Sequence, residues 1–146
     1  MAWAILAFAD YPAIRAAVDV SLTTANLPND TIALDIYAGA AVRDVTDRYP
    51  GAAAVTTPAS TQLKITAAAV YFCAARLAIP LAGVIVSSLS VSTRDQSFSR
   101  PPYNGEKRRE DLLALAEEEL TDILEPAEET PNRPTMFRLA PGYRGR

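Results

Sequence analysis

Apolar residues recur at helical spacing in the first third of the chain and predict two helices. The first spans about residues 11–20, with Asp10 at its N-cap position and Pro12 in its first turn. Its apolar face is Tyr11, Ile14 and Val18. The second runs from Thr31 to about Tyr49 and is followed by Pro50-Gly51. Its apolar positions are Leu34, Ala38, Ala41 and Val45, with Ile32 and Ile36 beside them and Arg43, Asp44, Asp47 and Arg48 on the opposite, solvated side.

Residues 61–79 are apolar over more than one face, which predicts the central and most buried helix of the fold. Ser60 can cap this helix and Pro80 stops it. Its stripe is Leu63, Thr66, Val70, Cys73 and Leu77, widened by Ile65, Ala69, Phe72 and Ala75. A last helix is predicted over about 106–124. Its apolar face is Leu112, Leu115, Ala116, Leu120, Ile123 and Leu124.

A different pattern begins after Gly83. Residues 84–93 are β-branched and serine-rich, so a strand is predicted there, turning at Arg94-Asp95 into a second short strand. This β-hairpin, at about 84–99, should pack on the helices or pair with another chain, because two strands alone are marginally stable. Residues 126–146 hold four of the 11 prolines and predict an extended arm.

The predicted fold is therefore mainly α and has two parts. Residues 1–125 form a four-helix bundle-like domain that carries the small β-hairpin, and residues 126–146 form an extended C-terminal arm. Of the 27 alanines, 23 precede Gly83, where such small side chains let helices approach closely. Trp3 and Phe8 are interpreted as packing residues, with an intersubunit contact as the alternative.

Composition argues against an enzyme. The chain has no histidine and one cysteine, which excludes imidazole chemistry, a zinc site built on Cys/His clusters and an intrachain disulfide. Cys73 lies within an apolar stripe and is predicted to be a small buried hydrophobe rather than a nucleophile. The block Glu117-Glu118-Glu119 is interpreted as a solvated face, because adjacent residues point in different directions around a helix. We expect no catalytic residues, no cofactor and no metal.

No apolar stretch predicts a membrane span or a signal peptide. The longest, residues 67–75, is too short to cross a bilayer, and the apolar opening of nine residues lacks a basic flank and is followed by Asp10. We therefore expect a soluble intracellular protein in which Cys73 is reduced.

Charge is distributed unevenly along the chain. Fourteen basic and 17 acidic residues give a net charge of −3, which does not favour a general nucleic-acid binder. Residues 117–129 contain seven acids and no base, whereas residues 130–146 contain four arginines and no acid. We expect the arm to order on a partner groove, with its arginines pairing carboxylates and its apolar residues as anchors. The predicted partner-binding residues are Arg133, Met136, Phe137, Arg138, Leu139, Tyr143 and Arg144.

A second basic feature is the run Lys107-Arg108-Arg109 at the start of the last helix. Three cations at the positive end of a helix are slightly unfavourable in an isolated chain. An acidic partner or a DNA phosphate nearby would offset this cost. The run is interpreted either as a plain solvated patch or as an intersubunit or DNA-facing surface.

The order of these elements carries a family resemblance. A polar-capped helix ending in Tyr49-Pro50-Gly51 is followed by the alanine-rich helix Ala67-Ala-Ala-Val-Tyr-Phe-Cys-Ala-Ala-Arg-Leu-Ala78, a Val/Ser-rich hairpin and a final leucine helix. This order resembles that of the head–tail connector (adaptor) proteins of tailed bacteriophages. The resemblance covers about residues 3–125, and the arm from Pro126 has no counterpart in it.

The resemblance implies a non-enzymatic virion subunit, located in the neck at the head–tail interface and made in the host cytoplasm. It implies a homo-oligomeric ring of twelve copies between the portal protein and the next neck or tail protein. DNA would pass through the channel without sequence-specific binding, and a slightly acidic chain suits this, since a basic lumen would hold phosphates.

Two alternatives stay open. One is another neck component, such as a stopper or tail-completion protein. The other is a nucleic-acid-binding helical module that uses Lys107, Arg108, Arg109 and the arginines of the arm.

Overall fold

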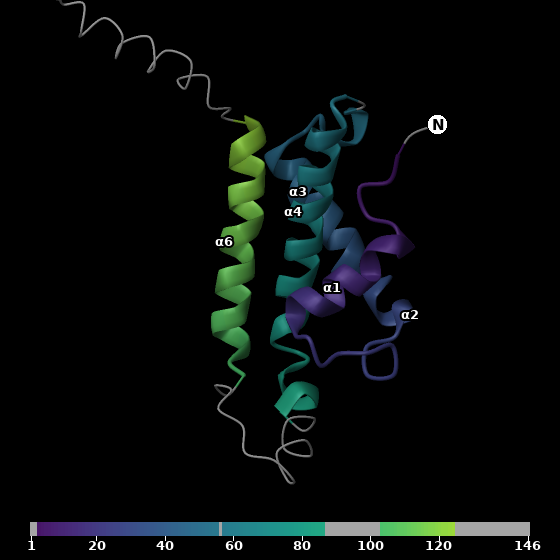
Figure 1. Ribbon diagram of the computed structural model, residues 1–146, viewed down its shortest axis with the longest axis vertical. Coiled ribbons are helices and arrows are strands. Elements are labelled where there is room, and N and C mark those ends of the chain that lie inside the picture. Colours follow the sequence, from purple (N-terminus) through teal and green to yellow (C-terminus); the bar gives the residue numbers. More distant parts are fainter. Residues whose placement is uncertain (1–2, 56, 87–102, 125–146) are drawn as a thin grey trace, which may run out of the picture.

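The computed structural model describes residues 3–55, 57–86 and 103–124, and every regular element within these ranges is helical (Figure 1). The two longest helices, α4 (Ala59–Ala78) and α6 (Gly105–Leu124), lie side by side and run in opposite directions. α4 also contacts α1 (Tyr11–Val18) and α3 (Ala40–Arg48). The mainly α prediction is confirmed for this part of the chain, with α4 at its centre.

The central position of α4 follows from its small and apolar side chains. Its buried residues are Ile65, Ala68, Ala69, Val70, Phe72, Cys73, Ala74, Ala75, Leu77 and Ala78. The alanines let neighbouring helices approach closely, and α6 packs on α4 through Leu112, Ala116 and Leu120, spaced four residues apart. The predicted burial of three outer positions is wrong, because Leu63, Leu115 and Leu124 are 70%, 37% and 47% exposed.

The start of α6 is fixed against the end of α4. The Tyr103 hydroxyl donates a hydrogen bond of 2.8 Å to the main-chain oxygen of Ala78. At Gly105, a Cβ atom would lie 3.0 Å from that same oxygen, so the absence of a side chain permits this close approach. The Asn104 side chain caps α6 by accepting from the Lys107 N–H at 3.1 Å.

α1 buries the apolar face predicted for it, namely Tyr11, Ile14 and Val18. Asp10 stands at the N-cap position, but its carboxylate accepts from the Ala7 N–H at 2.8 Å and stabilises the preceding 3-10 turn η1 (Phe8–Asp10). Trp3 is partly buried against the core, as predicted. The prediction that Phe8 packs in the core is wrong, because Phe8 is 67% exposed and its ring centroid lies 5.0 Å from that of Tyr11 at the start of α1.

The single helix predicted over residues 31–49 is wrong, because the chain forms three elements there. These are α2 (Asn29–Ile32), the π-helical turn η2 (Asp35–Gly39) and α3. Leu34 is extended, and its carbonyl starts the next turn by accepting from the N–H groups of Tyr37 and Ala38. The break leaves Leu34 and Ile36 exposed. The positions beyond it, Ala41 and Val45, are fully buried as predicted.

The β-hairpin predicted at about 84–99 is wrong for its first three residues. Residues 82–86 are helical, and the Ile85 N–H donates to the Leu81 carbonyl at 3.0 Å. Ile85 is fully buried, so tertiary packing outweighs the strand preference of the β-branched residues around it. The rest of the hairpin, 87–99, and the predicted arm, 126–146, lie outside the residues that the structure describes.

Candidate functional site

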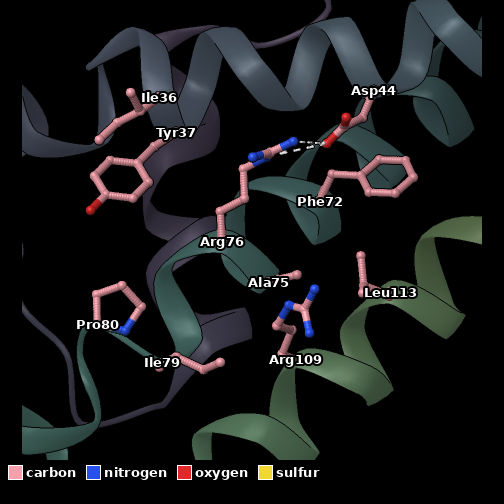
Figure 2. A pocket seen from close by; sticks show the side chains of 10 residues that line it. All are labelled: Ile36, Tyr37, Asp44, Phe72, Ala75, Arg76, Ile79, Pro80, Arg109 and Leu113. Atoms are coloured by element: carbon pink, nitrogen blue, oxygen red, sulfur yellow. Dashed lines mark hydrogen bonds and ion pairs between the residues drawn. The ribbon is translucent and has the colours of Figure 1, made fainter.

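A cavity of about 400 Å³ lies between η2, α3, α4 and α6 (Figure 2). Its lining is Ile36, Tyr37, Asp44, Phe72, Ala75, Arg76, Ile79, Pro80, Arg109 and Leu113. Most of these side chains are apolar, and Ile36 and Ile79 are 61% and 45% exposed. The cavity therefore combines an apolar surface with two guanidinium groups, those of Arg76 and Arg109.

One of these guanidinium groups is neutralised by α3. Arg76 donates from Nη2 and Nε to the same carboxylate oxygen of Asp44, at 2.8 and 3.2 Å. Half-exposed ion pairs of this kind stabilise a fold only weakly. The pair sets the orientation of Arg76. Because the Asp44 carboxylate neutralises the Arg76 guanidinium, these two side chains add no net charge to the cavity.

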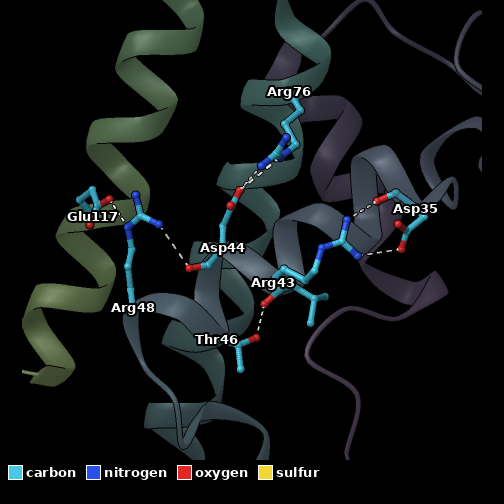
Figure 3. A network of polar contacts seen from close by, with 8 residues as sticks. Asp35, Arg43, Asp44, Thr46, Arg48, Arg76 and Glu117 are labelled. Atoms are coloured by element: carbon cyan, nitrogen blue, oxygen red, sulfur yellow. Dashed lines mark hydrogen bonds and ion pairs between the residues drawn. The ribbon is translucent and has the colours of Figure 1, made fainter.

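A polar network continues from this pair towards α6 (Figure 3). Arg48 of α3 donates from Nη1 to the main-chain oxygen of Asp44 at 3.3 Å and forms an ion pair with Glu117 of α6. The Arg48 guanidinium also lies 4.9 Å from the ring centroid of Phe72, within the range of a cation–π contact. These contacts join α3 to both long helices at one edge of the cavity.

Arg109 has no hydrogen bond or ion pair to any residue in the described ranges. The other seven Lys and Arg side chains there do have a partner: Arg15, Arg43, Arg48, Lys64, Arg76, Lys107 and Arg108. Figure 2 shows Arg109 on the α6 side of the cavity. The cavity therefore presents one uncompensated positive charge beside an apolar surface.

A groove of about 550 Å³ lies between α1, α4 and α6. It is lined by Asp10, Ala13, Ala16, Ala17, Leu63, Thr66, Ala67, Val70, Tyr71, Arg108 and Leu115. Through Leu115 it adjoins a shallow acidic hollow on α6, lined by Asp111, Ala114, Leu115, Glu117, Glu118 and Thr121. This second region combines exposed leucines with negative charge.

The groove and the cavity lie on opposite sides of α4. Residues nine positions apart in an α-helix are turned by about half a circle. Each of the five residues that α4 contributes to the groove has a counterpart nine positions later in the cavity lining. With the groove residue first, the pairs are Leu63 and Phe72, Thr66 and Ala75, Ala67 and Arg76, Val70 and Ile79, and Tyr71 and Pro80. On α6, Arg109 at the cavity and Glu118 at the acidic hollow are likewise nine positions apart, so they lie on opposite sides of that helix.

The predicted basic run does not form one surface. Lys107 pairs with Asp111 at 2.8 Å, and this carboxylate raises the pKa of the Lys107 amine. Arg108 donates to the main-chain oxygen of Ala17, and Arg109 lines the cavity. The predicted partner-binding residues of the arm, Arg133, Met136, Phe137, Arg138, Leu139, Tyr143 and Arg144, lie outside the described ranges.

Sequence reasoning missed Arg76 and its pairing with Asp44. A charged residue that interrupts the apolar run 67–78 was the available signal for Arg76. For Asp44 the sequence pattern predicts only a solvated side, because the helix that carries its partner cannot be identified from periodicity.

Cys73 is fully buried, and burial raises the pKa of its thiol to about 12, so it is not a thiolate at neutral pH. No group of three or more His, Cys, Asp or Glu side chains that could hold a metal ion occurs within residues 3–55, 57–86 and 103–124. None of the helices described there is long and apolar enough to cross a membrane.

Comparison of the chain with protein-family models, with curated proteins and with solved structures finds no match. The function of the chain is therefore inferred from the geometry of the two surfaces and from the order of its elements.

Proposed function

We propose that this chain is a structural subunit of a bacteriophage neck. In this proposal it forms a ring that joins the portal protein to the next neck or tail protein and lets DNA pass through. The observation that carries the proposal is the pair of different apolar surfaces on opposite sides of α4. A subunit of a closed ring needs two non-identical contact surfaces, one for each neighbour.

The order of elements predicted from the sequence resembles that of phage adaptor proteins, which supports the same proposal. Of that order, the structure retains the alanine-rich helix α4 and the final leucine helix α6, whereas the helix before Tyr49 is split and residues 84–86 are helical. In this proposal α1, α3, α4 and α6 are the four-helix bundle-like body, and the twelve copies stand in the virion neck without enzymatic activity. The arm, through Arg133, Phe137, Tyr143 and its other anchors, makes the contact with a neighbouring neck protein.

Electron microscopy of negatively stained particles tests the proposal. We expect rings of the purified protein, or added density at one end of the portal assembly of the same phage when the two are mixed. A variant lacking residues 126–146 should keep its helical circular dichroism and fail to join the portal. Unchanged portal particles at saturating amounts of the full chain would contradict the proposal, and normal assembly by the truncated chain would contradict the role of the arm.

The alternative of a nucleic-acid-binding module is less well supported by the contacts. Lys107 and Arg108 already have protein partners, which leaves Arg109 as the one cation of the predicted run without a partner in the described ranges. A gel shift of duplex DNA at about 50 mM salt separates the two ideas, because phosphate-driven binding is strong at low salt. Binding there that weakens steeply with added salt would favour the module.

A further inference from the structure

We propose that copies of this chain associate head to tail, with the cavity side of one copy packed against the groove side of the next. The inference rests on the proposed function, because it assumes that the assembly is a ring. What it adds is the two surfaces through which neighbouring copies make contact. The cationic surface comprises Ile36, Arg76, Ile79 and Arg109 around the cavity. The acidic surface comprises Leu63, Asp111, Leu115 and Glu118 along the groove and the adjoining hollow.

Charge complementarity identifies a second copy as the occupant of each surface. Arg109 has no partner in the described part of its own chain, and neither has Glu118, which is exposed on α6. The other two charged residues of these surfaces already have partners within the chain, since Arg76 pairs with Asp44 and Asp111 pairs with Lys107. Arg108 in the groove keeps its positive charge, because its partner is the neutral main-chain oxygen of Ala17, but Asp10 lies in the same lining. With Glu118 added, the groove side is left with a net negative charge and the cavity side with a net positive one, and such surfaces attract each other and repel their own kind.

Exposed apolar side chains give the contact its driving force. On the cationic surface Ile36 and Ile79 are 61% and 45% exposed, and on the acidic surface Leu63 and Leu115 are 70% and 37% exposed. Burying such side chains against one another is favourable, and apolar patches bordered by charge are typical of protein interfaces. In a monomer these four side chains would stay in contact with water and would contribute no burial energy.

The placement of the surfaces determines the symmetry of the assembly. The cationic and acidic surfaces differ and lie on opposite sides of α4. When the cationic surface of one copy binds the acidic surface of another, the resulting dimer therefore still has one free acidic and one free cationic surface. Further copies then add until the rotation closes a ring. A self-complementary contact would stop at two copies instead.

Charge reversal tests this arrangement in the full chain by sedimentation velocity. In R109E the new carboxylate faces Glu118 of the next copy, and in E118R the new guanidinium faces Arg109 of the next copy. Because like charges then meet, each variant alone should associate at least about tenfold more weakly than the original chain. Mixing the two variants, or combining both changes in one chain, restores opposite charges at every contact and should restore association. E110R is the matched control, since Glu110 lies on the same helix outside both linings and its reversal should change nothing.

Several outcomes would overturn the inference. One is a monomeric original chain at concentrations up to about 1 mM, and another is association that stops at dimers. A third is a loss in R109E and E118R that mixing does not rescue although circular dichroism shows both folded. The readout is independent of the portal, so copies that associate but never bind a portal contradict only the proposed function. Portal binding with unaltered association of R109E and E118R contradicts only this inference.

Discussion

Arg108, in the first turn of α6, donates from Nε to the main-chain oxygen of Ala17 at 2.9 Å. Its Nη2 donates to the same oxygen. Ala17 belongs to the last turn of α1, where carbonyl groups have no partner within the helix and a cation is favourable. One arginine therefore ties α1 to α6 across 91 positions of sequence.

We predict that R108Q lowers the free energy of unfolding by about 1–3 kcal/mol, because it removes charge-assisted hydrogen bonds to a partly buried carbonyl. E110Q is the matched control on the same turn of α6, where Glu110 is exposed and lines neither surface, and it should change this free energy by less than about 0.5 kcal/mol. Urea unfolding followed by circular dichroism measures both. Equal effects of the two variants would show that Arg108 is a surface residue like Glu110.

Arg15 offers a second test, because it is a charged residue that is only 6% exposed. It donates from Nε to the main-chain oxygen of Leu27 at 2.8 Å and from Nη2 to the Asn29 side chain, so it holds the loop after α1 in place. We predict that R15M lowers the free energy of unfolding by about 1–3 kcal/mol, since a buried carbonyl loses its donor. N29A keeps the bond to Leu27 and should cost less, and a larger loss in N29A would contradict this order.

The positions of the helices could be predicted from sequence where a continuous apolar face meets clear helix-ending residues. The helix ended by Pro80 and the helix that follows Asn104 are examples, and the structure places them as α4 and α6. The split at Leu34 could not be predicted, because the apolar spacing continues through it. Gly39 was the available signal, since a Cβ there would overlap the Asp35 carboxylate that pairs with Arg43.

The candidate surfaces were less predictable than the helices. A periodic pattern shows that Leu112 and Leu115 both lie near one face, but not where the neighbouring helix stops covering that face. The division of Lys107, Arg108 and Arg109 among three environments likewise depends on where α1 and α4 lie relative to α6. The spacing of residues within one helix carries no information on where other helices lie, so these contacts could not be predicted from it.

The edge of the α4–α6 contact gives a third prediction. Leu112 is fully buried and Leu115 is 37% exposed, although they lie three positions apart on one helix. L112A should lower the free energy of unfolding by about 2–5 kcal/mol, because it leaves a cavity in the core. L115A removes the same atoms and should cost less than about 1 kcal/mol. Thermal and urea unfolding of the two variants side by side measures the difference, and similar losses would place Leu115 in the core.

The last prediction concerns Cys73, which lies fully buried in α4. Burial raises the pKa of this thiol from 9.0 to about 12, against the opposite effect of Arg76. Above pH 9 the unfolded chain therefore loses the thiol proton while the folded chain keeps it. The unfolded state then binds fewer protons, so stability decreases as pH rises, by up to about 1.4 kcal/mol per pH unit between the two pKa values.

Comparison with C73A separates this effect from groups whose titration does not depend on Cys73. Burial also raises the pKa of Tyr103, which weakens the fold in the same direction and equally in both chains. The pKa of Tyr11 is raised by burial and also by the Cys73 thiolate, so the second part of its effect disappears in C73A together with that of Cys73. C73A is expected to be less stable near neutral pH because of the lost packing, and to have a flatter decline between about pH 9 and 11. The free energy of unfolding measured by urea at several pH values gives both slopes. Parallel slopes would mean that the Cys73 thiol ionises in the folded chain as readily as in the unfolded one.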